Sequence, residues 1–173
     1  MRRKISSRKW SATANDLYQR AENEWKKGRL RSAFRLFLGA AKAGMAPAYK
    51  TVGQFYDLGD GVKPDPNAAL YWYGRAYRHG DFSAANNIGC IWRERGNVGR
   101  ALTWFRRAVK LGDPEANLNI AKIYVDQRRN PKKALGYLHR VRRAKGVTEG
   151  SREETKRLLK KLGSSGEEKD PRA

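Results

Sequence analysis

The strongest constraint on the fold is a pattern of alanine, large apolar and glycine residues that occurs three times with identical spacing. In each copy, apolar or small residues follow an alanine at offsets 3, 4, 7 and 8, and a glycine follows at offset 11. These offsets place five side chains on one face of an α-helix, and the glycine suits the left-handed conformation that ends many helices. The pattern therefore predicts three amphipathic helices, which are Ala33-Leu36-Phe37-Ala40-Ala41-Gly44, Ala69-Trp72-Tyr73-Ala76-Tyr77-Gly80 and Ala101-Trp104-Phe105-Ala108-Val109-Gly112.

A second type of helix alternates with the first. Its pattern starts four residues after each of those glycines, at Ala48, Ala84 and Ala116, and continues with apolar or small residues at offsets 4, 5 and 8. Leu17, Ala21 and Trp25 fit it near the N-terminus, so the units begin at intervals of 31, 36 and 32 residues. Periods of this size are typical of helical repeats. Glycines in the middle of these helices, such as Gly53 and Gly89, predict that neighbouring helices approach closely.

One unit resembles a known repeat. It reads Ala48-x3-Val52-Gly53-x2-Tyr56-x2-Gly59, then Gly61-Val62-x2-Asp65-x3-Ala69-x2-Trp72-Tyr73-x2-Ala76, and closes at Gly80. This is similar to a Sel1-like repeat, a relative of the tetratricopeptide repeat, and the resemblance covers about Leu17 to Gly146. It weakens in the fourth unit, where Ala134-Tyr137-Leu138-Val141 is followed by a glycine one residue late. The resemblance implies an all-α solenoid of about four antiparallel helix pairs.

The segments at the two ends lie outside the repeats. We expect a basic, flexible arm at 1–12, the repeat domain at 13–146, a capping helix at 147–162 and a disordered tail at 163–173. Ser151-Arg152-Glu153-Glu154 has the form of a capping box, with Leu158, Leu159 and Leu162 on the apolar side of the helix that it opens. A terminal helix of this kind is expected because the last layer of a solenoid has no neighbour.

Several classes of protein are excluded by composition. The single cysteine, Cys90, cannot form an internal disulfide, and the two histidines, His79 and His139, form no cluster at metal-ligand spacing. No phosphate-binding glycine loop, nucleophile elbow or metalloprotease motif is present. We therefore expect no enzyme activity, catalytic residue, cofactor or metal. The absence of a long apolar run predicts a cytoplasmic protein without a membrane span, although the Arg- and Ser-rich start is also typical of mitochondrial transit peptides.

The charge of the chain is strongly one-sided, with 38 Lys and Arg against 17 Asp and Glu and a net charge of +21. Residues 48–84 are neutral, so the excess is added at the ends and in the later units. It includes one helix column (Lys42, Arg78, Lys110, Arg143), a companion column (Arg75, Arg107, Arg140) and the arm (Arg2, Arg3, Lys4, Arg8, Lys9, beside Trp10). Cations in the last turn of a helix stabilise it whatever the protein binds. A one-sided field also attracts polyanions.

A partner-binding groove is implied by the resemblance. In tetratricopeptide-like folds the first helix of each unit lines the concave surface with a stripe of side chains. The corresponding residues are Gln19, Asn23 and Lys26, then Lys50, Gln54 and Asp57, then Asn86, Cys90 and Arg93, then Leu118, Lys122 and Val125. Their amide groups suit the backbone of an extended peptide. The alternative is that they are ordinary solvated helix surface.

The function that these features favour is a non-enzymatic scaffold or adaptor that binds another protein, which we expect to be acidic, in the groove. The alternative hypothesis is binding of nucleic acid, RNA above all, through the basic arm and the two helix columns. Trp10 would then stack on a base. The alternative is that Trp10 closes the first helix pair. Trp25, Trp72, Trp92 and Trp104 occupy repeat positions and are expected to serve packing. We expect no small-molecule substrate.

Overall fold

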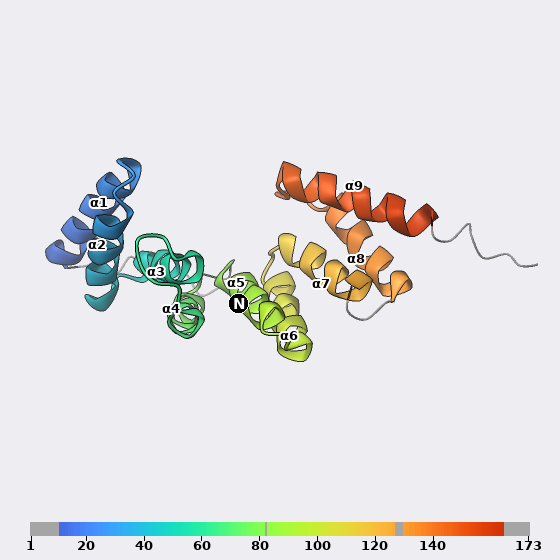
Figure 1. Ribbon diagram of the computed structural model, residues 1–173, viewed down its shortest axis with the longest axis horizontal. Coiled ribbons are helices and arrows are strands. Elements are labelled where there is room, and N and C mark those ends of the chain that lie inside the picture. The colour runs from blue at the N-terminus through green and yellow to red at the C-terminus, as the bar shows by residue number, and fades with distance from the viewer. Residues whose placement is uncertain (1–10, 82, 127–129, 165–173) are drawn as a thin grey trace, which may run out of the picture. The chain divides into compact units, whose positions relative to one another are not determined.

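A computed structural model describes residues 11–81, 83–126 and 130–164. Within these ranges the chain forms nine α-helices and no strand, which confirms the all-α prediction (Figure 1). The helices are α1 Ala12–Lys26, α2 Leu30–Lys42, α3 Ala46–Leu58, α4 Pro66–Arg78, α5 Ser83–Glu94, α6 Val98–Lys110, α7 Glu115–Asp126, α8 Pro131–Arg143 and α9 Glu149–Ser164. In each repeat the odd-numbered helix is called the first helix and the even-numbered one the second.

The second helices end where the repeated glycines predict. Gly44, Gly80 and Gly112 follow α2, α4 and α6 with φ angles of +88°, +94° and +98°. This left-handed conformation is readily adopted by glycine and costly for other residues. The glycine spacing therefore sets the length of the second helices.

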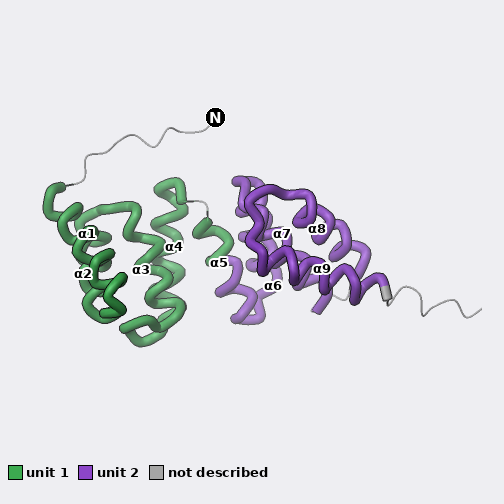
Figure 2. Tube along the Cα trace, turned by 90° about the horizontal axis from the view of Figure 1, so that it is seen from above, with its two compact units in different colours: residues 1–88 green, residues 89–173 purple. Residues whose placement is uncertain are grey.

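The N-terminal unit, residues 1–88, contains α1 to α4 and the first half of α5 (Figure 2). Consecutive helices pack on one another in chain order, α1 on α2, α2 on α3 and α3 on α4. Phe37, Tyr49, Val52 and Tyr73 are each at most 1% exposed and form much of its core. Each helix pair thus buries its apolar face partly against the next pair, as expected of a repeat.

The C-terminal unit, residues 89–173, contains the second half of α5 and α6 to α9. Here α6 packs on α7, α7 on α8, and α9 on both α8 and α7. Leu158 of α9 joins a buried cluster with Leu118, Leu138 and Val141. A terminal helix therefore covers the last pair, although the predicted capping box is wrong. The helix begins at Glu149, and the hydroxyl of Thr148 accepts the bond from the amide of Ser151 at 3.3 Å.

Mid-helix glycines mark the close contacts within both units. A Cβ added to Gly53 would lie 2.6 Å from Cδ1 of Tyr73, and one added to Gly89 would lie 2.6 Å from Cδ1 of Phe105. Each aromatic ring comes from the second helix of the same repeat and lies directly on the glycine backbone. The predicted close approach of the helices is confirmed.

Trp25 departs from the packing role that its repeat position predicts, because its side chain is 49% exposed. Its equivalent in the next repeat, Tyr56, packs edge-on against Phe34 of the preceding second helix. In the described part of the chain no helix precedes α1, so one side of Trp25 has no such neighbour. Its other side contacts Phe37 and Phe55. Trp72 is buried, and Trp92 and Trp104 are half-buried.

Candidate functional site

In the N-terminal unit the predicted groove residues differ in exposure. Gln19, Asn23 and Lys26 of α1 are exposed, whereas Lys50, Gln54 and Asp57 of α3 and Asn86 of α5 are half-buried. The ammonium of Lys50 donates to Ser83 Oγ at 3.2 Å and pairs with Asp81 Oδ2 at 3.4 Å. Lys50 therefore links α3 to the beginning of the next first helix.

Asp57 is also engaged inside the fold. The hydroxyl of Tyr73, which is 1% exposed, donates to Asp57 Oδ2 at 3.1 Å. Burial raises the pKa of the Asp57 carboxyl above its usual value, and the bond from Tyr73 opposes that shift. Asp57 thus accepts a hydrogen bond from a buried phenol, while its partial burial disfavours the charged form of its carboxyl group.

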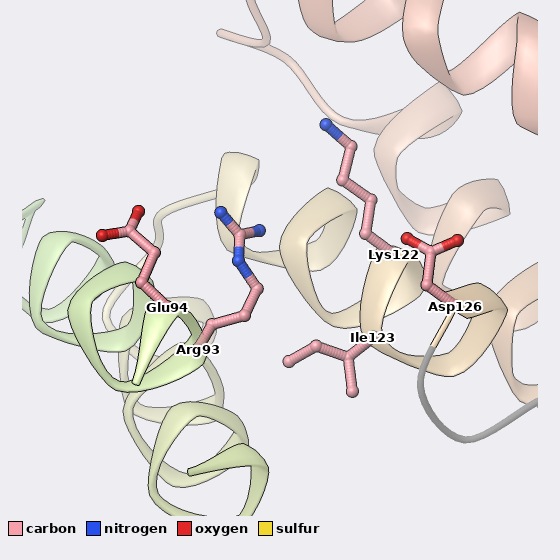
Figure 3. A pocket seen from close by; sticks show the side chains of 5 residues that line it. All are labelled: Arg93, Glu94, Lys122, Ile123 and Asp126. Carbon is pink, nitrogen blue, oxygen red and sulfur yellow. The ribbon is translucent and has the colours of Figure 1, made fainter. Parts of the chain in front are cut away.

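In the C-terminal unit two predicted groove residues, Arg93 and Lys122, line one hollow of about 390 Å³ (Figure 3). Arg93 and Glu94 come from the last turn of α5, and Lys122, Ile123 and Asp126 come from α7. Ile123 is 1% exposed and lies between the charged side chains. The two successive first helices therefore bring two cations to either side of an apolar residue.

Both cations of the hollow are held by contacts with their own chain. Arg93 Nη1 donates to Asn119 Oδ1 at 2.9 Å, and Lys122 pairs with Glu154 of α9 at 3.7 Å. The pKa of the Glu154 carboxyl is lowered, chiefly because Arg157 donates a hydrogen bond to it. Cys90 lies beside this network, with its sulfur 4.0 Å from Asn119 Nδ2.

The fourth repeat does not present its stripe to solvent. Leu118 is 5% exposed and Val125 is half-buried, and both pack in the cluster that includes Leu158 and Leu162 of α9. The hydrophobic character of these two positions was the available signal that something covers them. Only Lys122 of this repeat's predicted stripe reaches the hollow, at its edge next to α9.

The sequence patterns missed the other residues of the hollow. Glu94 and Asp126 occupy equivalent repeat positions, one residue after Arg93 and Val125, and both are exposed. Comparing repeats at that position would have found them.

The first basic column has one position in every second helix. Lys42, Arg78, Lys110 and Arg143 are the last residues of α2, α4, α6 and α8, and all are exposed. Among the described residues none of the four forms an ion pair. Their position fits helix-end stabilisation, and their exposure leaves them accessible to an anion.

The companion column stacks on aromatic rings three positions earlier in its own helix. The guanidinium carbon of Arg107 lies 4.6 Å from the ring centroid of Trp104, and that of Arg140 lies 4.9 Å from that of Tyr137. Arg75 stacks on Trp72 and, at 4.4 Å, on Tyr49, whose hydroxyl accepts its hydrogen bond. Cation–π contacts therefore fix these side chains.

The arm residues Arg2, Arg3, Lys4, Arg8, Lys9 and Trp10 lie outside the described residues. The described ranges contain no group of three or more His, Cys, Asp or Glu side chains placed to hold a metal ion. Across the same residues, no helix is both long enough and apolar enough to cross a membrane.

Consecutive antiparallel helix pairs that pack in chain order define the class of helical-repeat proteins. A family model of the Sel1 repeat matches residues 46–81, 83–113 and 114–140, more than half of the chain, and the chain belongs to this family. The matched segments begin at the second predicted unit. Sel1 repeat proteins generally act as scaffolds for protein interactions and are typically not enzymes.

Solved structures show the same fold. A Sel1 repeat protein from Oxalobacter formigenes is 27% identical with a TM-score of 0.55, over 78% of this chain and 61% of that one. The c5321 protective antigen of uropathogenic Escherichia coli is 14% identical with a TM-score of 0.67, over 90% and 39%. MamA protein is 18% identical with a TM-score of 0.64, over 90% and 92%. The chain thus spans less than two thirds of the first two proteins.

Proposed function

We propose that this protein is a scaffold that binds an acidic segment of another protein at the hollow between α5 and α7. The observation that carries the proposal is the pair of cations, Arg93 and Lys122, on either side of the apolar Ile123. An aspartate or glutamate side chain of the partner would lie between the two cations, over the part of the wall that the buried Ile123 forms. Contacts within the chain already hold both cations, which reduces the entropy lost on binding.

The charges around the hollow would set the register of the bound segment. Glu94 and Asp126 are exposed in its lining and repel acidic side chains that lie over them. An acid of the partner is therefore favoured at one place, between Arg93 and Lys122. The net charge of +21 would raise the rate at which an acidic partner is encountered.

The test replaces both cations by neutral residues of similar length, Arg93→Gln with Lys122→Gln. Glutamine avoids a new carboxylate beside Glu154. A photoreactive amino acid at position 94 cross-links the partner in the native cell, and mass spectrometry identifies it. We expect one acidic protein to be cross-linked, and its yield to fall at least about tenfold in the double variant, the size of effect that loss of a charged hydrogen bond produces.

The matched control is Arg142→Gln with Lys145→Gln, which removes the same charge at two exposed positions in and after α8. It should leave the cross-linked yield unchanged. Equal yields from the Arg93/Lys122 variant and this control would refute binding at the hollow. Cross-linking only to neutral or basic proteins would refute the acidic partner.

A further inference from the structure

Acidic residues are absent from every second helix. α6 and α8 carry nine basic residues and no Asp or Glu, and α2 and α4 carry five basic residues and no Asp or Glu. The chain has 17 acidic residues in 173, so four helices of 13 residues would hold about five by composition alone. The acids among the described residues lie instead on the first helices, on α9 and in the turns, as with Glu94, Glu115 and Asp126.

Helix stability does not explain this distribution. The macrodipole favours cations in the last turn but acids in the first turn, where it disfavours cations. The first turns of the four second helices contain no acid, yet three of them hold basic residues: Arg31 in α2, Arg100 in α6, and Lys132 and Lys133 in α8. The first turn of α4 holds neither, and Asp65 caps it. The macrodipole therefore leaves the cations in the first turns of α2, α6 and α8 unexplained.

In the C-terminal unit we call the surface formed by these residues the basic second-helix face. It consists of Arg100, Arg106, Arg107, Lys110, Lys132, Lys133, Arg140, Arg142 and Arg143, all of which are exposed. Among the described residues none of the nine forms an ion pair. α6 and α8 are equivalent members of successive repeats, both packed on α7, so Arg107 corresponds to Arg140 and Lys110 to Arg143. No described acidic neighbour therefore neutralises these charges, and the charges of α6 and α8 recur at equivalent repeat positions.

Aromatic rings hold several of these arginines in place. Arg100 lies 4.4 Å from the ring centroid of Trp92, in addition to the stacked pairs formed by Arg107 and Arg140. Arg106 donates to the hydroxyl of Tyr124 at 3.3 Å and also bonds Tyr137. A guanidinium that stacks by its face keeps its N–H edge directed outward, and that edge matches the oxygens of a phosphate.

The same contacts indicate which polyanion the face suits. Arginines lie on Trp92, Trp104 and Tyr137, so a cation already occupies one face of each ring on which an unpaired base could stack. Within the described part of this unit, the one large apolar side chain that is exposed is Leu111, at 38%, so little is available to insert into a bilayer. Cations that are held in place, with few groups beside them for stacking or membrane insertion, suit the regularly spaced phosphates of a duplex.

We infer that the basic second-helix face binds the phosphate backbone of a double-stranded nucleic acid without reading its sequence. The inference does not depend on the hollow between α5 and α7, whose lining residues belong to the first helices. It also differs from the RNA hypothesis of the sequence analysis. That hypothesis expected Trp10 to stack on a base, whereas this inference relies on contacts to the phosphates of a duplex. Duplex DNA and duplex RNA both present this chemistry, and the experiment separates them.

The experiment measures binding of the whole chain to 20-base-pair DNA and RNA duplexes by fluorescence anisotropy across a series of salt concentrations. The variant is Lys110→Glu with Lys132→Glu and Arg143→Glu, and the control is Arg20→Glu with Lys27→Glu and Arg29→Glu. Both change three exposed cations to acids, the first on second helices and the second in α1 and the turn after it. Circular dichroism checks that both variants keep their helices.

We expect submillimolar binding to at least one duplex at low salt, with log K falling linearly as log salt rises. Loss of three phosphate contacts would reduce the magnitude of that slope by about 2 to 3 in the Lys110/Lys132/Arg143 variant, while the control keeps the wild-type slope. Tighter binding to single strands, to anionic vesicles or to polyglutamate of equal charge than to either duplex would overturn the inference. So would equal slopes for the variant and the control, or no binding at low salt.

Discussion

At the scale of single residues, the repeat depends on glycines that lie against aromatic rings. In both units a ring of the second helix touches the backbone of a glycine in the first helix, Tyr73 on Gly53 and Phe105 on Gly89. A glycine inside a helix costs about 1 kcal/mol relative to alanine. The closeness of the ring offsets that cost, because no side chain fits between the ring and the backbone. Gly136 in α8 is different, with open space where its Cβ would lie.

Gly89→Ala and Gly136→Ala should therefore change stability in opposite directions. Alanine at position 89 would have to displace Phe105, which is fully buried, and should destabilise the protein by about 1–3 kcal/mol. Alanine at position 136 meets no neighbour and should stabilise α8 by about 0.4–1 kcal/mol. Urea unfolding followed by circular dichroism measures both. A stabilising Gly89→Ala would show that ring contact is not the reason for this glycine.

Asp57 should make stability depend on pH in a defined direction. Burial raises its pKa in the folded protein, so the folded state holds the proton more tightly than the unfolded chain does. Its contribution to stability is therefore greatest below the unfolded pKa and declines as the pH rises through the raised folded pKa. Asp57→Asn removes this titration and keeps an oxygen that can accept from Tyr73.

We accordingly expect Asp57→Asn to gain stability relative to the wild type as the pH rises from about 3 to 6. Thermal melts of both proteins at each pH provide the comparison, and Asp16→Asn, an exposed change in α1, serves as the control. A difference between wild type and Asp57→Asn that stays constant with pH would contradict the effect of burial on the Asp57 pKa.

At the scale of helices, the repeat pattern predicted which face of each helix is buried within its own pair. It also placed the glycine ends of α2, α4 and α6, because both properties are local to about a dozen residues. Contacts that depend on the next repeat were not predictable. Lys50 reaches Asp81 and Ser83, Arg93 reaches Asn119, and Lys122 reaches Glu154. The periodicity predicts on which face of its own helix such a side chain lies. It does not predict which residues of the following repeat the side chain contacts.

The two ends of the repeat array show the same limit. Trp25 matches the pattern of a buried residue, but burial at that position requires a preceding second helix. The capping residue of α9 was misplaced by three residues, because the hydroxyl of Thr148 and not that of Ser151 caps the helix. The choice between the two hydroxyls is decided by Glu115 of α7, whose Oε1 accepts from the amide of Thr148 at 2.7 Å and whose Oε2 accepts from the hydroxyl of Ser151.

Removing that carboxylate should loosen α9. Glu115→Ala leaves the Thr148 amide and the Ser151 hydroxyl without their acceptor, and should cost about 1.5–3 kcal/mol, as for a hydrogen bond to a charged group. Hydrogen exchange should rise first in the amides of α9, since the other contacts of α7 remain. Glu149→Ala, at an exposed acid in the first turn of α9, is the comparison. Equal exchange in the two variants would mean that Glu115 does not fasten the helix.

At the scale of the whole molecule, net charge opposes folding. A chain of 173 residues with a net charge of +21 brings like charges together when it becomes compact. Exposed ion pairs such as Arg20 with Asp16 offset little of this repulsion, since pairs of this kind stabilise the folded state by about 0–1 kcal/mol. The fold therefore retains a repulsive term that screening by salt should reduce. This repulsion would be relieved if a polyanion or an acidic protein bound to the basic surface.

Salt should consequently raise the melting temperature. Between 20 and 300 mM NaCl the Debye length shrinks to less than about 10 Å, and a gain of about 1 kcal/mol corresponds to a rise of about 2–4 °C for a chain of this size. Sodium chloride is preferable to sulfate, which stabilises proteins by exclusion from their surface as well. The Lys110→Glu, Lys132→Glu, Arg143→Glu variant has less repulsion to screen, so its melting temperature should depend less on salt. A wild-type melting temperature that falls with added NaCl would instead mean that attractive ion pairs outweigh the repulsion, and that the excess of basic residues carries no cost that a bound anion relieves.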